Sequence, residues 1–265
     1  MTLRDLLPEY RHYNMDWLIE EFEKGIPHKY IYFWGNTPYS NDKIGRECFS
    51  QWYNSPFTVN EVTYKTAEHW MMAQKAMLFN DLKTFEQIIL CEKPGEAKAL
   101  GRQVVGYDDL VWDEAKYDIV KLGNIHKFNQ NKVPGEFLLS SNNRVLVEAS
   151  PVDRIWGAGI SKESKHIDNL YAWPGLNLLG FALMEVRDFF LEFGYIKDTN
   201  GLLPPPWIQF PGISQHDMYW RMGKGEDYIT ALGKQDQMMD NRTQIEYFLN
   251  NPAPYDWPGY YSDIE

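Results

Sequence analysis

Hydrophobic positions along the chain fall into two patterns, short continuous apolar runs and longer amphipathic segments. The run Tyr30-Ile-Tyr-Phe-Trp34 predicts a buried strand, and Asn60-Glu61 between two short apolar segments predicts a tight hairpin. Helical spacing of apolar residues predicts helices over 15–25, 67–80, 81–90, 97–102, 113–130 and 176–193. The nearly continuous apolar run 144–148 predicts a central strand. Because these elements follow no strict β–α–β alternation, we expect an α+β fold.

The chain divides into three regions by composition. Residues 1–29 are a polar N-terminal arm with the first predicted helix, and residues 30–194 hold the predicted strands and most helices. Residues 195–265 begin with a connector rich in Pro and Gly, and a last helical segment is expected over 236–250. This extension retains large aromatic residues, which disordered tails lack: Trp207, Phe210, Tyr219, Trp220, Tyr247 and Trp257. We therefore expect it to be ordered and to pack on the main domain.

Composition adds a charge imbalance and a high aromatic content. The formal net charge is −11, and 15% of the residues are aromatic. A protein that grips a long nucleic acid usually has a basic face, so we expect no extensive basic nucleic-acid surface. Contacts with a base would be confined to a pocket, where aromatic rings supply stacking surfaces.

Signals for secretion, membrane insertion and metal binding are weak. The two cysteines are far apart, the six histidines are scattered, and neither set has the spacing of a metal site. No apolar run is long enough to span a membrane, and the charged N-terminus lacks the apolar core of a signal peptide. We expect an intracellular protein, cytoplasmic or nuclear, that works without a metal or cofactor.

The first candidate for chemistry is the predicted helix that starts after Thr66. Glu68 and Lys75 fall on one face of this helix, separated by apolar side chains. Partial burial would raise the pKa of Glu68 and lower that of Lys75, which is the tuning that acid–base chemistry needs. The same spacing also fits a plain surface, in which Glu68 favours the helix N-terminus and Lys75 extends into solvent.

The second candidate is the turn that follows the predicted strand 144–148. Asp153 and Trp156 lie in it, and Gly157 and Gly159 allow backbone amides to approach a phosphate or sugar. Loops at strand ends often display catalytic groups. A tight turn with a capping Asp and a core Trp explains the same residues, so the pattern leaves both interpretations open.

Further candidates are basic, amide and aromatic residues on neighbouring segments. Asn124 and Lys127 share a face of the helix 113–130 and suit binding of a phosphate or ribose, although a solvated helix face has the same spacing. Arg46 in a polar loop, Arg102 and Trp112 suggest ligand binding without specifying it.

Taken in order, these segments resemble the NADAR (YbiA-like) family. The matching segments are 49–53 (FSQWY), 66–75 (TAEHWMMAQK), 97–102 (AKALGR), Trp112, 124–128 (NIHKF), 148–157 (EASPVDRIWG) and 175–187. They span most of residues 30–194, while 1–29 and 195–265 lie outside the resemblance. A match of this length is more specific than any single short motif.

The resemblance implies a mixed α/β domain that binds ADP-ribose-like ligands and hydrolyses N-glycosidic bonds. Some members remove ADP-ribose from the amino group of guanine in DNA, as antitoxins or their eukaryotic counterparts, and others cleave reactive intermediates of riboflavin synthesis. By matching positions, the family's expected active-site residues are Glu68, Trp112, Asp153 and Trp156. Lys75 and Lys127 match family lysines.

These implications lead to one preferred hypothesis and two alternatives. Glu68 would act as acid and base at the ribose and the leaving amine, and Asp153 would position water or the ribose hydroxyls. Trp112 and Trp156 would stack on the base or adenine, while Arg46, Arg102 or Lys127 would neutralise the diphosphate. The expected partners are the ADP-ribose moiety and an ADP-ribosylated guanine in single-stranded DNA or a nucleotide. Lys75 permits a rival covalent mechanism through an imine. The two alternative functions are an N-glycosidase that cleaves reactive riboflavin-pathway intermediates and, outside the enzymes, a non-catalytic ADP-ribose-binding module.

Overall fold

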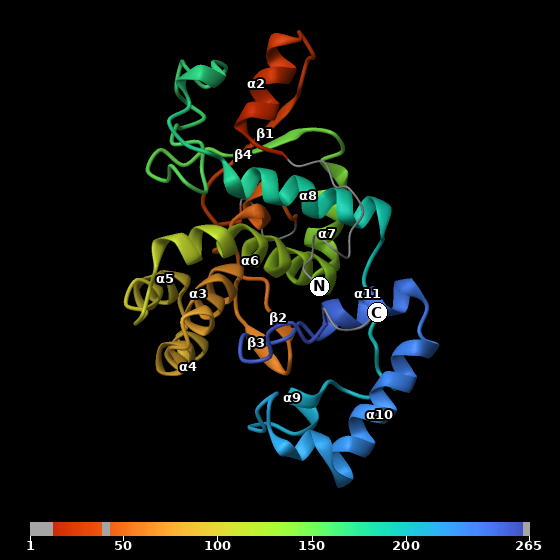
Figure 1. Cartoon of the computed structure of the whole chain (residues 1–265). Helices are drawn as coiled ribbons and strands as arrows, with labels where there is room; N and C mark the ends of the chain where they lie inside the picture. The colour runs from red at the N-terminus through yellow and green to blue at the C-terminus, as the bar shows by residue number, and fades with distance from the viewer. Residues whose placement is uncertain (1–12, 39–42, 262–265) are drawn as a thin grey trace. The chain divides into compact units, whose positions relative to one another are not determined.

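The computed structural model describes residues 13–38 and 43–261, which form two compact units. One unit comprises residues 13–57 and 63–194, apart from the gap, and the other comprises 58–62 and 195–261. The first unit is a mixed α+β domain, mostly helical with small sheets, as the sequence predicted (Figure 1).

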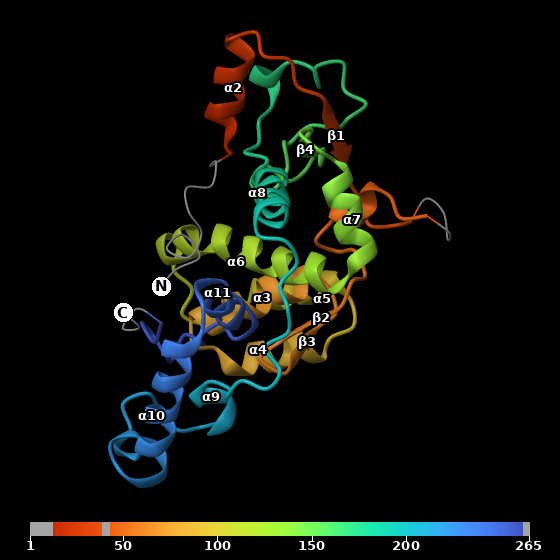
Figure 2. The same ribbon diagram turned by 90° about the vertical axis from the view of Figure 1, so that its right-hand side faces the viewer.

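The elements up to residue 194 run in the order α2 (Met15–Glu23), β1 (Tyr30–Phe33), η1 (Arg46–Phe49), β2 (Phe57–Val59), β3 (Val62–Tyr64), α3 (Ala67–Leu78), α4 (Leu82–Leu90), α5 (Pro94–Gly101), α6 (Asp109–Gln130), α7 (Lys132–Ser140), β4 (Val145–Glu148), η2 (Leu170–Ala172) and α8 (Leu178–Glu192). Helix α3 packs on α4, α5 and α6, and α8 packs on β4 and α6. The view in Figure 2 looks nearly along α8, which runs above α6 and beside β4.

Most of the predicted elements are confirmed. The hairpin turns at Asn60 and Glu61, whose φ angles of 47° and 64° are the left-handed values that a tight two-residue turn requires. Thr66 caps α3, since its Oγ1 accepts from the backbone N of His69 at 3.4 Å. Gly194, with φ 81°, follows α8 as a helix-ending residue.

The strand expected over 144–148 is confirmed as β4, but its expected central position in a sheet is wrong. Among the described residues, β4 pairs in parallel with β1 alone, with Tyr30 opposite Val145 and Phe33 opposite Glu148. Its first three residues, Val145, Leu146 and Val147, are nevertheless fully buried, because α8 covers the strand. A helix therefore supplies the burial that a second neighbouring strand was expected to supply.

Helix α7 is an element that the sequence pattern did not predict. Pro134 and Gly135 lie in its first turns and argue against a helix in the sequence. Proline is tolerated there because the first N–H groups of a helix have no partner within it. The single predicted segment 236–250 is also corrected, since α10 (Gly223–Met238) ends before Asp240, whose carboxylate caps a separate helix α11 (Asn241–Asn250).

Close packing around α3 depends on glycine at one position of α6. A Cβ on Gly123 would lie 2.3 Å from the Trp70 ring, so only glycine lets this indole reach its place. There Trp70 Nε1 donates to the carbonyl of Ile119 at 2.8 Å. The contact joins α3 to α6 and holds the first turn of α3, which carries Glu68.

The second unit contains α9 (Pro206–Gln209), η3 (Met218–Arg221), α10 and α11 around an aromatic cluster. Trp257 is buried, and its ring centroid lies 5.5 Å from that of Trp207 and 5.6 Å from that of Trp220. Asn60 of the hairpin donates to the carbonyl of Pro252 at 2.8 Å within this unit. The extension is thus ordered by ring packing, as its composition predicted.

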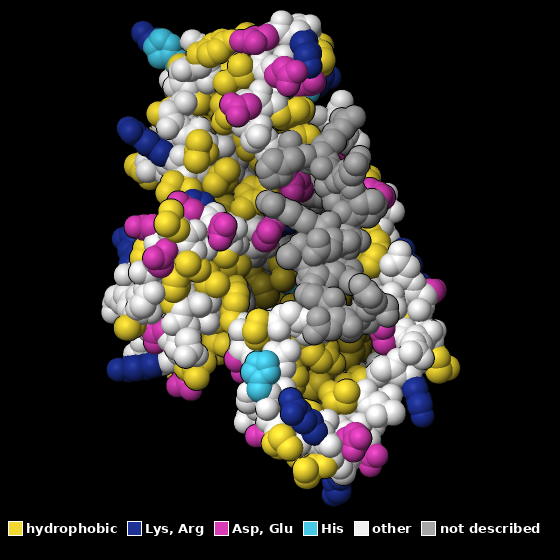
Figure 3. All heavy atoms as spheres, in the orientation of Figure 1, with side chains coloured by type: hydrophobic (Ala, Val, Ile, Leu, Met, Phe, Trp, Pro, Cys, Tyr) yellow, Lys and Arg dark blue, Asp and Glu magenta, His cyan; other side chains and the backbone are white. Residues whose placement is uncertain are grey.

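The described surface carries mixed charge. On the face shown in Figure 3, Lys and Arg side chains stand singly among Asp and Glu side chains. Within the described ranges, no helix has the length and apolarity needed to cross a membrane.

Candidate active site

A carboxylate enters the site from the first turn of α3. Glu68 is only 5% exposed, and its backbone N donates to the carbonyl of Gln51 at 3.0 Å. This bond ties the start of α3 to the segment after η1. The helix N-terminus favours a negative charge at this position, yet burial opposes it. The balance of these effects sets the protonation of Glu68.

Burial dominates the electrostatics of Glu68. It raises the pKa of this carboxyl to about 7, against the opposing charge of Lys98 and a hydrogen bond from the side chain of Trp52. The charge of Asp153 raises the pKa further, and that of Arg102 lowers it. A carboxyl with a pKa near 7 exchanges its proton readily at neutral pH, as a general acid or base must.

A second carboxylate, that of the half-buried Glu148, lies at the end of β4. Its backbone N donates to Oδ1 of Asn177 at 2.9 Å, which anchors the strand end to the start of α8. Burial raises the pKa of Glu148 to about 8, with further increases from the charges of Asp153 and Glu68. Its Oε2 is buried without a hydrogen-bond partner within the described structure. An oxygen buried without a partner is costly to charge, which favours the neutral form of this carboxyl.

Glu148 was not among the site residues predicted from the sequence, although it begins the motif that contains Asp153. A signal was present in the chain. A carboxylate that ends a fully apolar strand, directly before a Pro-containing turn, is an unusual choice for a buried pair of strands.

The turn after β4 brings Asp153 to the same place. Its Oδ1 accepts from the backbone N of Ile155 at 3.0 Å and from that of Trp156 at 2.8 Å. The capping interpretation of this Asp is therefore correct, and its charge also acts on Glu68 and Glu148. Asp153 thus both stabilises the turn and contributes negative charge that acts on the two glutamates.

The glycines of this turn serve close packing. A Cβ on Gly157 would lie 2.9 Å from the carbonyl oxygens of Asp153 and Glu148. Gly159 has φ 68°, and a Cβ there would lie 2.7 Å from the Pro174 ring. Both positions require glycine for the path of the backbone, and Trp156, directly before Gly157, is half-buried.

Two more residues at the site were not among the predicted ones. Trp52 is 37% exposed, its ring lies against Gly95 at the start of α5, and its side chain donates to Glu68. Lys98 of α5 lowers the pKa of both glutamates. Nothing in their spacing pointed to the site, because α5 meets α3 only through the tertiary fold.

Lys75 and Trp112 form a separate contact. Lys75 follows Glu68 by seven residues, about 10 Å along the helix axis. Its Nζ lies 3.9 Å from the centroid of the Tyr107 ring and 5.3 Å from that of Trp112. Burial lowers the pKa of Lys75, and the charge of Asp109 opposes this shift. Lys75, near the C-terminal end of α3, therefore contacts the aromatic rings of Tyr107, before α6, and Trp112, in α6.

Lys127 and Asn124 are both fully buried on α6. Lys127 Nζ donates to the carbonyl of Ser50 at 2.9 Å, and burial lowers the pKa of this amine to about 8. Asn124 Nδ2 donates to the carbonyl of Val120 at 2.8 Å, while its Oδ1 has no hydrogen-bond partner among the described residues. The alternative of a solvated helix face is wrong for these residues.

The predicted arginines lie at different places. Arg102, exposed at the end of α5, acts on Glu68 through its charge, whereas Arg46 lies in η1 and is half-buried. The structure thus brings Glu68, Asp153 and Arg102 together and adds Glu148, Trp52 and Lys98. It sets Lys75 beside Trp112, about two turns of α3 from Glu68. Among the described residues, no group of His, Cys, Asp and Glu has the arrangement of a metal site.

Comparison with known proteins gives consistent matches. The model of the NADAR domain family matches residues 32–191. The chain is 40% identical over 167 residues to the N-glycosidase R617 of Acanthamoeba polyphaga mimivirus, covering 60% of this chain and 95% of that protein. It is 33% identical over 132 residues to the maize riboflavin biosynthesis protein PYRR, covering 47% of this chain and 19% of that protein. The NMR structure of E. coli YbiA superposes with a TM-score of 0.49 at 24% identity, covering 66% of this chain and 92% of that one.

Proposed function

Because the chain belongs to the NADAR family of N-glycosidases, we propose that it removes ADP-ribose from the amino group of guanine in DNA or nucleotides. The observation that carries the proposal is a pair of glutamates, the buried Glu68 and the half-buried Glu148. Glu68 and Glu148 come from a helix and a strand far apart in sequence, and their pKa values are raised to about 7 and about 8. Two carboxyls with different protonation states are what hydrolysis of a glycosidic bond requires.

The reaction breaks the bond between the anomeric carbon of the ribose and the guanine amino nitrogen. Water adds to the anomeric carbon and gives its proton to the Glu68 carboxylate, which is ionised at a lower pH than Glu148. The protonated Glu148 gives its proton to the leaving nitrogen. The products are ADP-ribose and guanine with its amino group restored, and proton exchange with solvent returns both glutamates to their starting states.

The surrounding residues suit the substrate that this reaction needs. Asp153, held at Oδ1 by two backbone amides, orients a ribose hydroxyl or the water through its carboxylate. Trp52 and Trp156 are partly exposed rings on which a base can stack. Lys98 and Arg102 place positive charge beside the carboxylates, where a diphosphate would be attracted.

The direct test uses a single-stranded oligonucleotide that carries one ADP-ribosylated guanine. Wild-type protein should release ADP-ribose, Glu68→Gln should not, and Glu114→Gln on the exposed face of α6 should match the wild type. If the wild type binds ADP-ribose and leaves the oligonucleotide intact, the protein is a binding module and the proposal is wrong.

A second candidate function is supported by the similarity to the maize riboflavin biosynthesis protein. The same glutamate pair would then cleave the N-glycosidic bond of an intermediate of riboflavin synthesis. Parallel assays of that intermediate and of the modified oligonucleotide, at equal enzyme concentration, distinguish the two. A larger kcat/KM on the riboflavin intermediate would favour the second candidate.

The rival covalent route is tested by trapping. A lysine amine attacking the opened ribose would form an imine, which borohydride reduces to a stable adduct. Trapping during turnover, followed by mass spectrometry of wild type, Lys75→Ala and Lys127→Ala, identifies the attacking residue. An unmodified wild type under turnover supports direct attack by water.

A further inference from the structure

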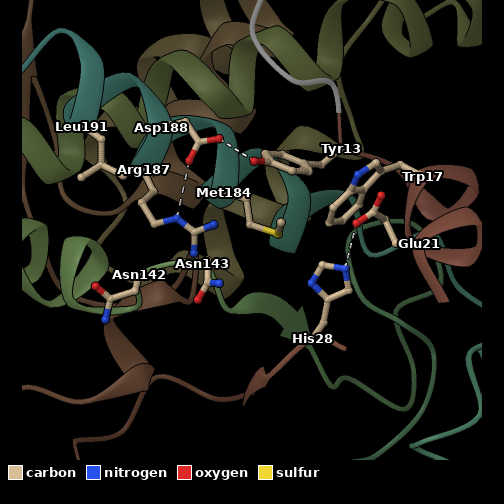
Figure 4. Close-up of a pocket in the computed structure, with 10 residues that line it drawn as sticks. All are labelled: Tyr13, Trp17, Glu21, His28, Asn142, Asn143, Met184, Arg187, Asp188 and Leu191. Carbon is tan, nitrogen blue, oxygen red and sulfur yellow. Dashed lines mark hydrogen bonds and ion pairs between the residues drawn. The ribbon is translucent and has the colours of Figure 1, made fainter. Parts of the chain in front are cut away.

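A cavity of about 320 Å³ lies at the other end of α8 from the glutamate pair. Its walls are α2 with the segment that follows it, the C-terminal half of α8, and the turn before β4 (Figure 4). Arg187 on its floor follows Asn177 by ten residues, about 15 Å along α8. Helix α2 lies outside residues 32–191, so part of this cavity is built by a segment that the family model does not cover.

Arg187, the one arginine among the described residues that line the cavity, is already engaged. Arg187 is 2% exposed, and its Nη1 donates to Ser141 Oγ at 3.0 Å and to the carbonyl of Arg144 at 2.8 Å. Its Nε lies 3.7 Å from Oδ1 of Asp188, which neutralises its charge. Oδ2 of the same carboxylate accepts from the hydroxyl of Tyr13 at 2.6 Å. An anionic ligand would have to compete with these acceptors.

The opposite wall carries the Glu21 carboxylate, whose negative charge has no permanently charged partner among the described residues of the cavity. Oε2 of Glu21 lies 3.4 Å from Nε2 of His28, a partner that carries a charge only when protonated. Among the described residues that line the cavity, Asp188 is paired with Arg187, so Glu21 gives the lining a net negative charge when His28 is neutral. The net charge of −11 on the whole chain adds attraction for cations at long range.

Aromatic faces line the same wall. The Trp17 ring lies one helical turn before Glu21 and 4.7 Å from the ring of Tyr13, centroid to centroid, and Figure 4 shows both rings at the cavity beside the Met184 side chain. A carboxylate next to a tryptophan face is the combination that binds organic cations, by ion pairing and by attraction to the ring quadrupole. We propose that this cavity binds a small organic cation, an alkylammonium or a guanidinium compound.

The test measures binding of agmatine, spermidine and choline to the full chain by calorimetry, with 1,4-butanediol as the uncharged control. The wild type should bind at least one of the cations and not the diol. Glu21→Gln should weaken binding by about tenfold or more, because it removes the charge and keeps the shape. Trp17→Phe should weaken it by a smaller factor, since Phe attracts cations less than Trp does.

Two matched variants locate the effect. Glu20→Gln changes the neighbouring carboxylate on α2, which is exposed and paired with Lys24 at 2.7 Å, and should leave binding unchanged. Glu68→Gln, in the other site, should also leave it unchanged. No binding of any cation by the wild type, equal losses in Glu20→Gln and Glu21→Gln, or loss of binding in Glu68→Gln would each overturn the proposal.

Discussion

The charge of Glu68, in the first turn of α3, raises the pKa of Glu148 at the end of β4. The two residues are eighty positions apart in the sequence and belong to elements of different type. Their proximity gives the protein a pair of carboxyls that are difficult to ionise together. We expect most of the catalytic behaviour of the protein to follow from this pair.

Replacing Glu68 by Gln should lower kcat on the modified oligonucleotide by about 10²- to 10⁴-fold, the range for loss of a general acid or base. The side chain keeps its shape, so the melting temperature should not fall. Single-turnover assays with thermal unfolding of the same samples check both points. A loss below about threefold would remove Glu68 from the chemistry.

The pH dependence of kcat/KM should be bell-shaped. Activity requires Glu68 ionised, so it rises as the pH passes about 7, and it requires Glu148 protonated, so it falls above about 8. Glu148→Gln should abolish the alkaline limb and lower the rate at the optimum, while Glu136→Gln on the exposed side of α7 should leave the profile unchanged. An unaltered alkaline limb in Glu148→Gln would assign that limb to another group.

Lys127→Met should separate stability from activity. Burial lowers the pKa of Lys127 to about 8 in the folded state, below its value in the unfolded chain, so its contribution to stability is lost as the pH falls through 8. Met avoids this penalty, although it leaves the Ser50 carbonyl without its donor.

We therefore expect Lys127→Met to be more stable than the wild type by about 1 kcal/mol at pH 6.5, with little difference at pH 10. Its activity should fall, because Lys127 holds the segment whose Gln51 carbonyl binds the backbone N of Glu68. Urea unfolding at the two pH values checks the sign. Greater stability at pH 10 than at pH 6.5, relative to wild type, would contradict it.

Trp52→Phe should move the acid limb of the pH profile. The change keeps a ring and removes the donor to Glu68, which raises the pKa of that carboxyl by about one unit. The rise of kcat/KM should therefore occur at a higher pH. Trp34→Phe, at an indole that is 59% exposed, is the matched control and should not move the limb. A shift to lower pH in Trp52→Phe would show that the indole stabilises the protonated form.

Local features of the fold were predictable from the sequence because each depends on residues close together in the chain. Asn60-Glu61 specifies its turn, Thr66 its helix cap, and Gly194 the end of α8. Helix α7 was missed because Pro134 and Gly135 oppose a helix locally, whereas their burial against neighbouring elements favours it. Tertiary packing outweighed local propensity there.

The candidate site was predictable only in part. Periodicity placed Glu68 and Lys75 on one face of a helix, and the structure then buried the first beside Glu148 and set the second over the Tyr107 ring. A shared helix face does not make a shared site, because seven residues of helix separate the two side chains by about two turns.

The sequence by itself determined the family resemblance, the turns and caps, and the presence of a carboxylate in each of two motifs. The tertiary structure alone decided that Glu148 joins them, that Lys127 is enclosed, and that α2 and α8 bound a cavity. The physical reason is that pKa values and cavities depend on which groups are excluded from water together. That exclusion is set by elements distant in the chain, and spacing along any one element does not reveal it.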